Sequence, residues 1–189
     1  MATATFRIWR GNAEKGEFQD YSAEVGEGMV VLDAVHQIQA TQAPDLACRW
    51  NCKAGKCGSC SAEINGRPKL MCMTRLNTLD LTAPVTVEPM RTFPNIRDLV
   101  TDVSWNFEVK EGIRKFRPRA PDAADGTWRM SQRDADRVQE FRKCIECFLC
   151  QDVCHVIRDH EENKKVFAGP RFFIKAAGLD MHPLDTRED

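Results

Sequence analysis

The chain has 189 residues, of which 42% are hydrophobic and 29% charged, and its formal net charge is −1. This composition is typical of a globular protein and lacks the basic excess that accompanies nucleic-acid binding. The sequence has no run of roughly 18 apolar residues that could form a membrane-spanning helix, and residues 1–10 lack the apolar core of a secretory signal. We therefore expect an intracellular protein whose cysteines, nine in number, serve in metal binding more than in disulfides.

The N-terminal part of the sequence predicts a β-hairpin followed by a helix. Apolar and polar residues alternate over residues 4–9 and again over residues 21–25, on either side of a turn-like stretch at residues 11–16. From residue 31 the apolar residues recur at helical spacing and predict one apolar stripe. The members of this stripe are Val31, Leu32, Val35 and Ile38. A hairpin followed by a helix indicates a ferredoxin-like sheet.

Short strands and a second helix are expected before residue 105. Residues 61–64 and 79–87 have strand-like composition, and the Asn-Gly pair at residues 65–66 has the composition of a hairpin turn. Apolar residues at helical spacing over residues 96–103 predict a helix in the connection to the second half. They are Ile96, Leu99, Val100 and Val103. We place the end of the first domain at residue 105.

The second half begins with an irregular segment and continues with a helix. Residues 114–126 are rich in Arg, Pro, Ala and Asp and have no core-forming pattern. Ser131 and Asp134 have the spacing of a capping box, so a helix is expected to start there. The apolar residues Val138, Phe141 and Ile145 predict that this helix continues to the second cysteine group.

A last helix completes the predicted fold. We expect it to begin at Pro170, to use the apolar residues 172–174 for packing and to end at Gly178. The predicted fold class is therefore α+β, with a sheet-containing domain at residues 1–105 and an all-α domain at residues 106–189.

Four cysteines in the first half have the spacing of a 2Fe-2S site. The pattern is C-x4-C-x2-C, eleven further residues separate the third cysteine from a fourth, and a 2Fe-2S cluster requires four thiolates. The predicted ligands are Cys52, Cys57, Cys60 and Cys72. Gly55 and Gly58 allow positive φ and let backbone N–H groups point at the cluster. Cys48 does not fit the spacing, and we interpret it as a small buried hydrophobic residue.

The second cysteine group has the pattern C-x2-C-x2-C-x3-C, which is typical of cubane-type clusters. Its members are Cys144, Cys147, Cys150 and Cys154. In two-cluster ferredoxins the fourth cysteine of this run serves the other cluster, so we assign the first three to one centre and Cys154 to another. Two such centres need more ligands, yet residues 155–189 contain no cysteine. His155, His160 and His182 form no compact ligand set.

Two cluster sites in one small chain suggest a protein that carries electrons, and a zinc-stabilised interaction module is an alternative of another class. A zinc-stabilised interaction module would prefer two C-x2-C knuckles, and within the first group only Cys57 and Cys60 form one. An enzyme with its own substrate chemistry would need a catalytic set, and the sequence shows no Ser/His/Asp arrangement, no GxGxxG motif and no suggestive pair of carboxylates. We therefore predict no catalytic residue on this chain.

These motifs, in this order, resemble the iron-sulfur subunit of succinate dehydrogenase and of its relative fumarate reductase. The resemblance covers nearly the whole chain and includes the segment that joins the two halves. It is carried by CKAGKCGSCSAEINGRPKLMC at residues 52–72, VEPMRTFPNIRDLVTD at residues 87–102, CIECFLCQDVC at residues 144–154 and FAGPRFF at residues 167–173.

The resemblance implies three clusters. A 2Fe-2S cluster would lie in an N-terminal β-grasp domain, with a 4Fe-4S and a 3Fe-4S cluster in a C-terminal helical ferredoxin-like domain. Cys144, Cys147 and Cys150 would bind the 4Fe-4S cluster and Cys154 the 3Fe-4S cluster. The family completes both sets with cysteines further downstream that this sequence lacks, so we expect the sequence to be truncated. The family also has Pro and a nearby Trp after the last cysteine, where this chain has His155, so its quinone contacts are not transferred.

The function implied by the resemblance is electron transfer in the tricarboxylic acid cycle. The chain would pass single electrons from an FAD-containing flavoprotein subunit of a succinate:quinone oxidoreductase to a quinone bound by membrane-anchor subunits. It would lie on the cytoplasmic face of the inner (plasma) membrane, held there by its partners. The alternatives are a quinol:fumarate reductase subunit and a soluble electron-carrier ferredoxin.

Overall fold

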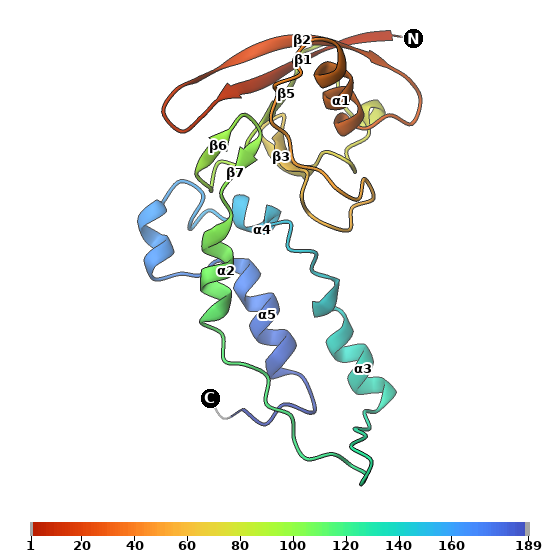
Figure 1. Ribbon diagram of the computed structural model, residues 1–189, viewed down its shortest axis with the longest axis vertical. Coiled ribbons are helices and arrows are strands. Elements are labelled where there is room, and N and C mark those ends of the chain that lie inside the picture. Colours follow the sequence, from red (N-terminus) through yellow and green to blue (C-terminus); the bar gives the residue numbers. More distant parts are fainter. Residues whose placement is uncertain (1, 188–189) are drawn as a thin grey trace.

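A long β-hairpin opens the fold, as predicted. The computed structural model describes residues 2–187, in which β1 (Ala2–Gly11) pairs antiparallel with β2 (Gly16–Val25) along their whole length. The sheet lies at one end of the molecule and the helices of the second half lie at the other (Figure 1). The predicted α+β class is therefore confirmed.

The hairpin belongs to a five-stranded mixed sheet with the order β2-β1-β5-β3-β4. β5 (Val85–Glu88) pairs parallel with β1, and all other neighbours are antiparallel. β3 (Ser61–Ile64) matches the predicted strand, whereas only the end of the strand predicted over residues 79–87 forms. β4 (Arg67–Leu70) was not predicted because it contains a proline, which an edge strand tolerates.

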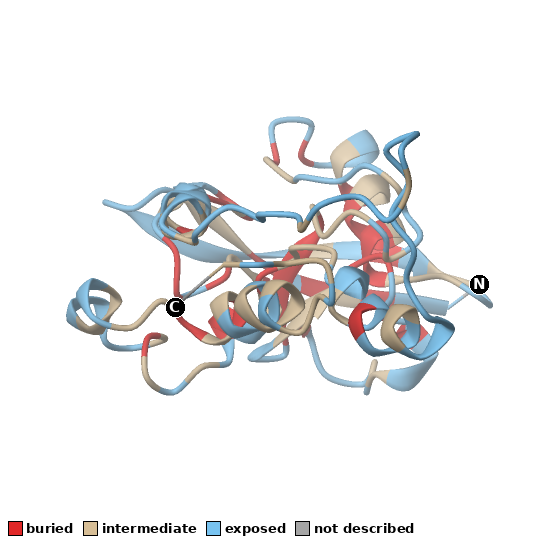
Figure 2. Cartoon of the chain, turned by 90° about the horizontal axis from the view of Figure 1, so that it is seen from below, coloured by how far each residue is buried: buried red, intermediate tan, exposed pale blue. Residues whose placement is uncertain are grey.

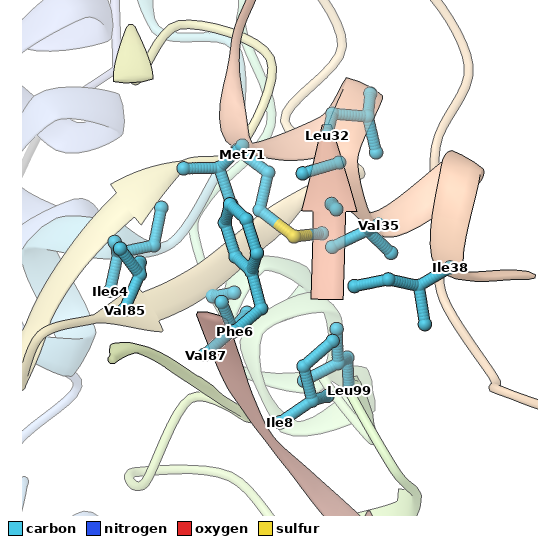
Figure 3. Close-up of a cluster of buried hydrophobic side chains, with 14 of the residues drawn as sticks. Phe6, Ile8, Leu32, Val35, Ile38, Ile64, Met71, Val85, Val87 and Leu99 are labelled. Carbon is cyan, nitrogen blue, oxygen red and sulfur yellow. The ribbon is translucent and has the colours of Figure 1, made fainter. Parts of the chain in front are cut away.

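One helix packs on this sheet and closes the main hydrophobic core. Helix α1 (Val31–Thr41) buries all four residues of the predicted stripe. Figure 3 shows side chains of α1 facing Phe6 and Ile8 of β1, with Met71 above the Phe6 ring. Phe6 and Ile8 are 0% exposed. Burial of this apolar surface gives the N-terminal half a core of its own.

The helix predicted over residues 96–103 is wrong. The segment forms a small hairpin of β6 (Asn95–Arg97) and β7 (Val100–Thr101). Asp98 at its tip has φ of 48° and is buried, and its carboxylate accepts hydrogen bonds from the backbone N–H groups of Gly11 and Ala47. These contacts, to residues far away in the sequence, fix a tight turn that the local apolar spacing could not reveal.

The second half is built from short helices. Between residues 104 and 187, the only strand-like pairing in the described part of the chain is an isolated bridge from Pro118 to Asp185. The segment at residues 114–126 is irregular, as predicted. The helices are α2 (Ser104–Glu111), α3 (Gln132–Gln139), α4 (Leu149–Asp152) and α5 (Pro170–Asp180). Helix α2 crosses the predicted boundary at residue 105, so the division into two domains stays a prediction.

Both ends of helix α3 can be compared with the sequence pattern. Its start is confirmed, because the Ser131 hydroxyl accepts a hydrogen bond from the Asp134 N–H at 3.2 Å. Its predicted continuation to Ile145 is wrong. The helix ends at Gln139, and a 3₁₀ turn at Phe141–Lys143 leads into the second cysteine group. Within that group the backbone of Glu146 has a positive φ of 54°, which is not a helical conformation.

Helix α5 begins at Pro170 as predicted but does not end at Gly178, because it continues to Asp180. Phe173 is 58% exposed and Ile174 39% exposed, and the Phe173 ring centroid lies 5.9 Å from that of Phe167, so these two residues bury little apolar surface within the described chain. Arg171 is instead only 5% exposed, because its guanidinium binds the Glu146 carboxylate. On α5 the buried side chain is therefore Arg171, paired with Glu146, and not the apolar residues at positions 173 and 174.

Buried residues gather in the middle of the molecule, whereas most of the outlying segments are exposed (Figure 2). Val138, Phe148 and Ile157 are the only buried apolar residues after Leu99 in the described part of the chain. Within those same residues, none of the helices combines the length and the apolar character needed to cross a membrane.

Candidate metal centres

The first cysteine group lies where a loop meets the sheet. Cys60 directly precedes β3, and Cys72 follows β4 by two residues. The register pairs Ser61 with Leu70, and the Met71 N–H donates to the Cys60 carbonyl at 3.0 Å, so the β3–β4 hairpin brings Cys60 and Cys72 together.

The four predicted ligands of the first group form two pairs. The Cys52 side chain contributes to the lowered pKa of the Cys57 thiol, and the Cys72 side chain affects the pKa of the Cys60 thiol, so the members of each pair lie near each other. Cys57 and Cys60 are also close enough for the charge of one to raise the pKa of the other. This arrangement suits a 2Fe-2S centre, in which four thiolates share two irons.

Several of these thiols lie in surroundings that favour a thiolate. The Cys52 sulfur accepts hydrogen bonds from the backbone N–H groups of Ala54 at 3.4 Å and Lys56 at 3.3 Å. Hydrogen bonds, first of all from the Ser59 side chain, lower the pKa of the Cys57 thiol to about 6. Cys60 differs, because burial raises the pKa of its thiol to about 11. A bound cation would be needed to keep Cys60 deprotonated at neutral pH.

The two glycines of this loop have the conformations that the sequence predicted. Gly55 has φ of 64° and Gly58 of 70°. A Cβ at Gly55 would lie 2.9 Å from the Met73 side chain, and a Cβ at Gly58 would lie 2.6 Å from the Cys147 Cα. The thiols, the amide donors and the close backbone approach together fit a 2Fe-2S cluster.

Cys48 is not arranged like the predicted ligands. It packs against the main core, and its sulfur lies 3.6 Å from the Arg49 carbonyl oxygen. Burial, with a smaller contribution from the Cys60 charge, raises the pKa of its thiol to about 12. These surroundings are those of a small apolar residue, as predicted.

The second cysteine group winds around the N-terminal end of α4. Cys144 follows the 3₁₀ turn, Cys150 lies within α4 and Cys154 lies two residues beyond its end. Burial raises the pKa of the Cys150 thiol, and the charges of Cys147 and Cys144 add to this effect. The three thiols are therefore near enough to influence one another's ionisation, and their assignment to one centre stays a prediction.

Polar contacts hold the second group against its neighbours. Glu146, between the first two cysteines of the run, accepts a hydrogen bond from the Lys110 ammonium of α2 at 2.8 Å and also binds Arg171 of α5. The Gln151 side chain of α4 is buried and donates to Asn106 of α2 at 3.0 Å. These supports were not predicted, because Glu146 and Lys110 lie 36 residues apart in the sequence and Gln151 and Asn106 lie 45 apart.

The two cysteine groups touch each other directly. The Ser61 hydroxyl lies 2.8 Å from the Cys147 carbonyl oxygen and 2.9 Å from that of Gly58. A cavity of about 260 Å³ lies beside this contact, lined by residues of both groups, Cys57 and Phe148 among them. The N-terminal lobe, which contains the sheet and α1, and the C-terminal lobe, which contains α2 to α5, are also joined by Arg158. Its guanidinium binds Glu63 of β3 at 2.6 Å.

Among residues 2–187, no group of three or more His, Cys, Asp or Glu side chains is arranged to hold a single metal ion. Three of the four histidines make other contacts: His160 lies 3.4 Å from Glu162, His182 packs against the Phe116 ring and His36 against Trp50.

Comparison with known proteins agrees with this geometry. Residues 5–108 match the family model of the 2Fe-2S iron-sulfur cluster binding domain. The chain is 39% identical to the fumarate reductase iron-sulfur subunit of Mycobacterium tuberculosis, over 74% of this chain and 57% of that protein. The chain thus spans little more than half the length of this relative.

Two further matches cover more of the related chain. The fumarate reductase iron-sulfur subunit of Wolinella succinogenes is 30% identical over 98% of this chain and 78% of its own length. A solved structure, described as the Mycobacterium smegmatis Sdh1 complex in the apo form, contains a chain that is 64% identical, with a TM-score of 0.94. The match covers 98% of this chain and 77% of that one. The chain therefore belongs to the family of iron-sulfur subunits of succinate dehydrogenase and fumarate reductase.

Proposed function

We propose that this chain is the electron-transfer subunit of a succinate:quinone oxidoreductase. In this role it passes single electrons from an FAD-containing flavoprotein subunit towards a quinone held by membrane-anchor subunits. The observation that carries the proposal is the contact between the two cysteine groups, in which the Ser61 hydroxyl reaches the Cys147 carbonyl. Iron-sulfur clusters supply one-electron chemistry between a two-electron donor and an acceptor reduced in single steps.

The proposed ligands follow the sequence assignment. Cys52, Cys57, Cys60 and Cys72 hold a 2Fe-2S cluster in a β-grasp domain at residues 1–105. Cys144, Cys147 and Cys150 contribute to a 4Fe-4S cluster and Cys154 to a 3Fe-4S cluster, in an all-α ferredoxin-like domain at residues 106–189. The pairing of the first four thiols and the mutual approach of Cys144, Cys147 and Cys150 support these assignments.

The chain's own residues orient the ligands and keep their charge balanced. Backbone N–H groups at Ala54 and Lys56 stabilise negative charge on the Cys52 sulfur. Lys110 and Arg171 fix Glu146 and with it the turn between Cys144 and Cys147. None of these residues acts on a dicarboxylate in the proposal, which leaves substrate chemistry to the flavoprotein partner.

A quinol:fumarate reductase is the second candidate, because the curated relatives carry that name. The chain of the Sdh1 complex is more similar in sequence and favours succinate oxidation. In both cases the chain would lie on the cytoplasmic face of the inner membrane, held there by its partner subunits. Comparing the rates of succinate oxidation and fumarate reduction by the purified complex decides between the two directions.

The ligand assignment is tested by replacing cysteines in the complex purified from cells. Cys57→Ala is expected to abolish the EPR signal that succinate induces from the 2Fe-2S cluster. Cys48→Ala is the matched control and should retain the signal, since Cys48 packs against the core. Loss of the signal in both variants, or in neither, would contradict the assignment. A chain that purifies alone as a brown protein would support a soluble electron-carrier ferredoxin instead.

A further inference from the structure

The contact between the cysteine groups depends on one side chain that is not a ligand. Ser61 is the first residue of β3 and is only 5% exposed. The strand fixes its backbone, because Ser61 is paired with Leu70 of β4. Its hydroxyl lies between two carbonyl oxygens that belong to different cysteine groups, Gly58 O at 2.9 Å and Cys147 O at 2.8 Å.

The Ser61 hydroxyl is a hydrogen-bond donor within reach of both carbonyl oxygens. A serine hydroxyl has one proton, which two acceptors in this geometry must share. Without the proton, two partly negative oxygens would lie in a poorly solvated position with no donor between them. Such unsatisfied acceptors are costly, so the loops would be expected to move apart.

Gly58 makes the approach possible sterically. A Cβ at this position would lie 2.6 Å from the Cys147 Cα and 2.9 Å from its backbone nitrogen. Only a residue without a side chain allows the backbone of the first group to touch the backbone of the second. Gly58 is also bonded directly to Cys57, so the contact connects one proposed ligand to another, Cys147, with no intervening side chain.

Other contacts hold the two lobes together independently of Ser61. Arg158 binds Glu63 at 2.6 Å, and the backbone N–H of Thr92 donates to the Asp152 carboxylate at 3.0 Å. Removing the Ser61 hydroxyl should therefore loosen the local contact between the cysteine groups without separating the lobes.

From these observations we propose that Ser61 is a positioning residue for electron exchange between the two cysteine groups, and that the Gly58–Cys147 contact it fixes is the route of exchange. This inference rests on the proposed function. Electron exchange weakens steeply with the separation of donor and acceptor, so a small local displacement slows it while leaving both clusters in place. Ser61 reaches backbone oxygens and no sulfur, so the reduction potentials should be preserved.

The test uses Ser61→Ala, the conservative variant Ser61→Thr and the control Ser22→Ala, which removes the hydroxyl of an exposed serine on β2. Each is made in the complete complex. The measurements are iron content, the midpoint potentials of both centres, and the rate at which an electron introduced rapidly into the first centre reaches the second.

We expect Ser61→Ala to keep its iron and its potentials and to slow the exchange, by at most the roughly 100-fold that a misplacement of reacting groups by about 1 Å can cost. Ser61→Thr restores the hydroxyl and should restore the rate, and Ser22→Ala should behave as wild type. An unchanged rate in Ser61→Ala would overturn the inference, as would loss of iron, which would show a role in assembly. Absence of exchange in the wild-type complex would overturn the proposed function itself.

Discussion

The two halves of the molecule are stabilised in different ways. The N-terminal half buries a continuous apolar core between the sheet and α1, with Phe6, Ile8 and Leu32 inaccessible to solvent. After Leu99, the described chain buries only Val138, Phe148 and Ile157 as apolar residues. Hydrophobic burial therefore accounts for the first half, but the second half requires additional sources of stability.

The second half compensates with polar contacts around its cysteines. Glu146 binds Lys110 and Arg171, and Gln151 binds Asn106. Small domains with little core commonly depend on metal, and metal binding then contributes directly to folding. The first cysteine group is therefore attached to a sheet with its own hydrophobic core. The second group belongs to a region that a bound cluster would help to order.

The two halves should differ most in how much stability they lose when one phenylalanine is replaced by alanine. Phe6 is 0% exposed and Phe173 is 58% exposed. Phe6→Ala is expected to reduce the free energy of unfolding by about 3–5 kcal/mol, because it leaves a cavity in a packed core. Phe173→Ala should change it by less than about 0.5 kcal/mol. Denaturant unfolding of the purified chain measures both, and equal losses would contradict the comparison.

The junction between the halves can be weakened at Arg158. This guanidinium binds Glu63 and lies near Asp152, and both carboxylates belong to fully buried residues. Arg158→Met leaves them without their cation and is expected to lower the free energy of unfolding by about 3 kcal/mol. Arg91→Met is the control, because the Arg91 side chain is 56% exposed and reaches Asp159 only at 4.0 Å. Similar stability of the two variants in thermal or denaturant unfolding would show that the junction does not depend on this ion pair.

A smaller and more local effect is expected at the start of α3. Ser131→Ala removes the acceptor for the Asp134 N–H and should destabilise the first turn by about 1 kcal/mol. Ser131→Asn should keep most of the stability, since asparagine is an equally good capping residue. Amide hydrogen exchange at the first turn of α3 measures the change, and identical protection in both variants would argue against the cap.

The elements that the sequence predicted correctly are those with local signals. The opening hairpin, the apolar stripe of α1, the cap at Ser131 and the start of α5 at Pro170 each depend on residues within a few positions of one another. The helix predicted over residues 96–103 failed because Asp98 is fixed by Gly11 and Ala47, which lie 87 and 51 residues away.

The candidate site shows the same limit. Cysteine spacing is the local signal on which the predicted ligands depend, because a cluster constrains residues that are close in the sequence. The residues that support them were not predictable, since Ser61 meets Cys147 across 86 positions and Arg158 meets Glu63 across 95. Such partners become visible only when the chain is folded.

The central claim is that the two cysteine groups hold separate iron-sulfur centres. Its most direct test is the iron and acid-labile sulfide content per chain in the brown complex purified from cells. We expect two irons per chain from the first cysteine group and further iron from the second. The total would be about nine irons per chain if all three clusters of the family are present. A natively folded, colourless chain without iron would contradict it.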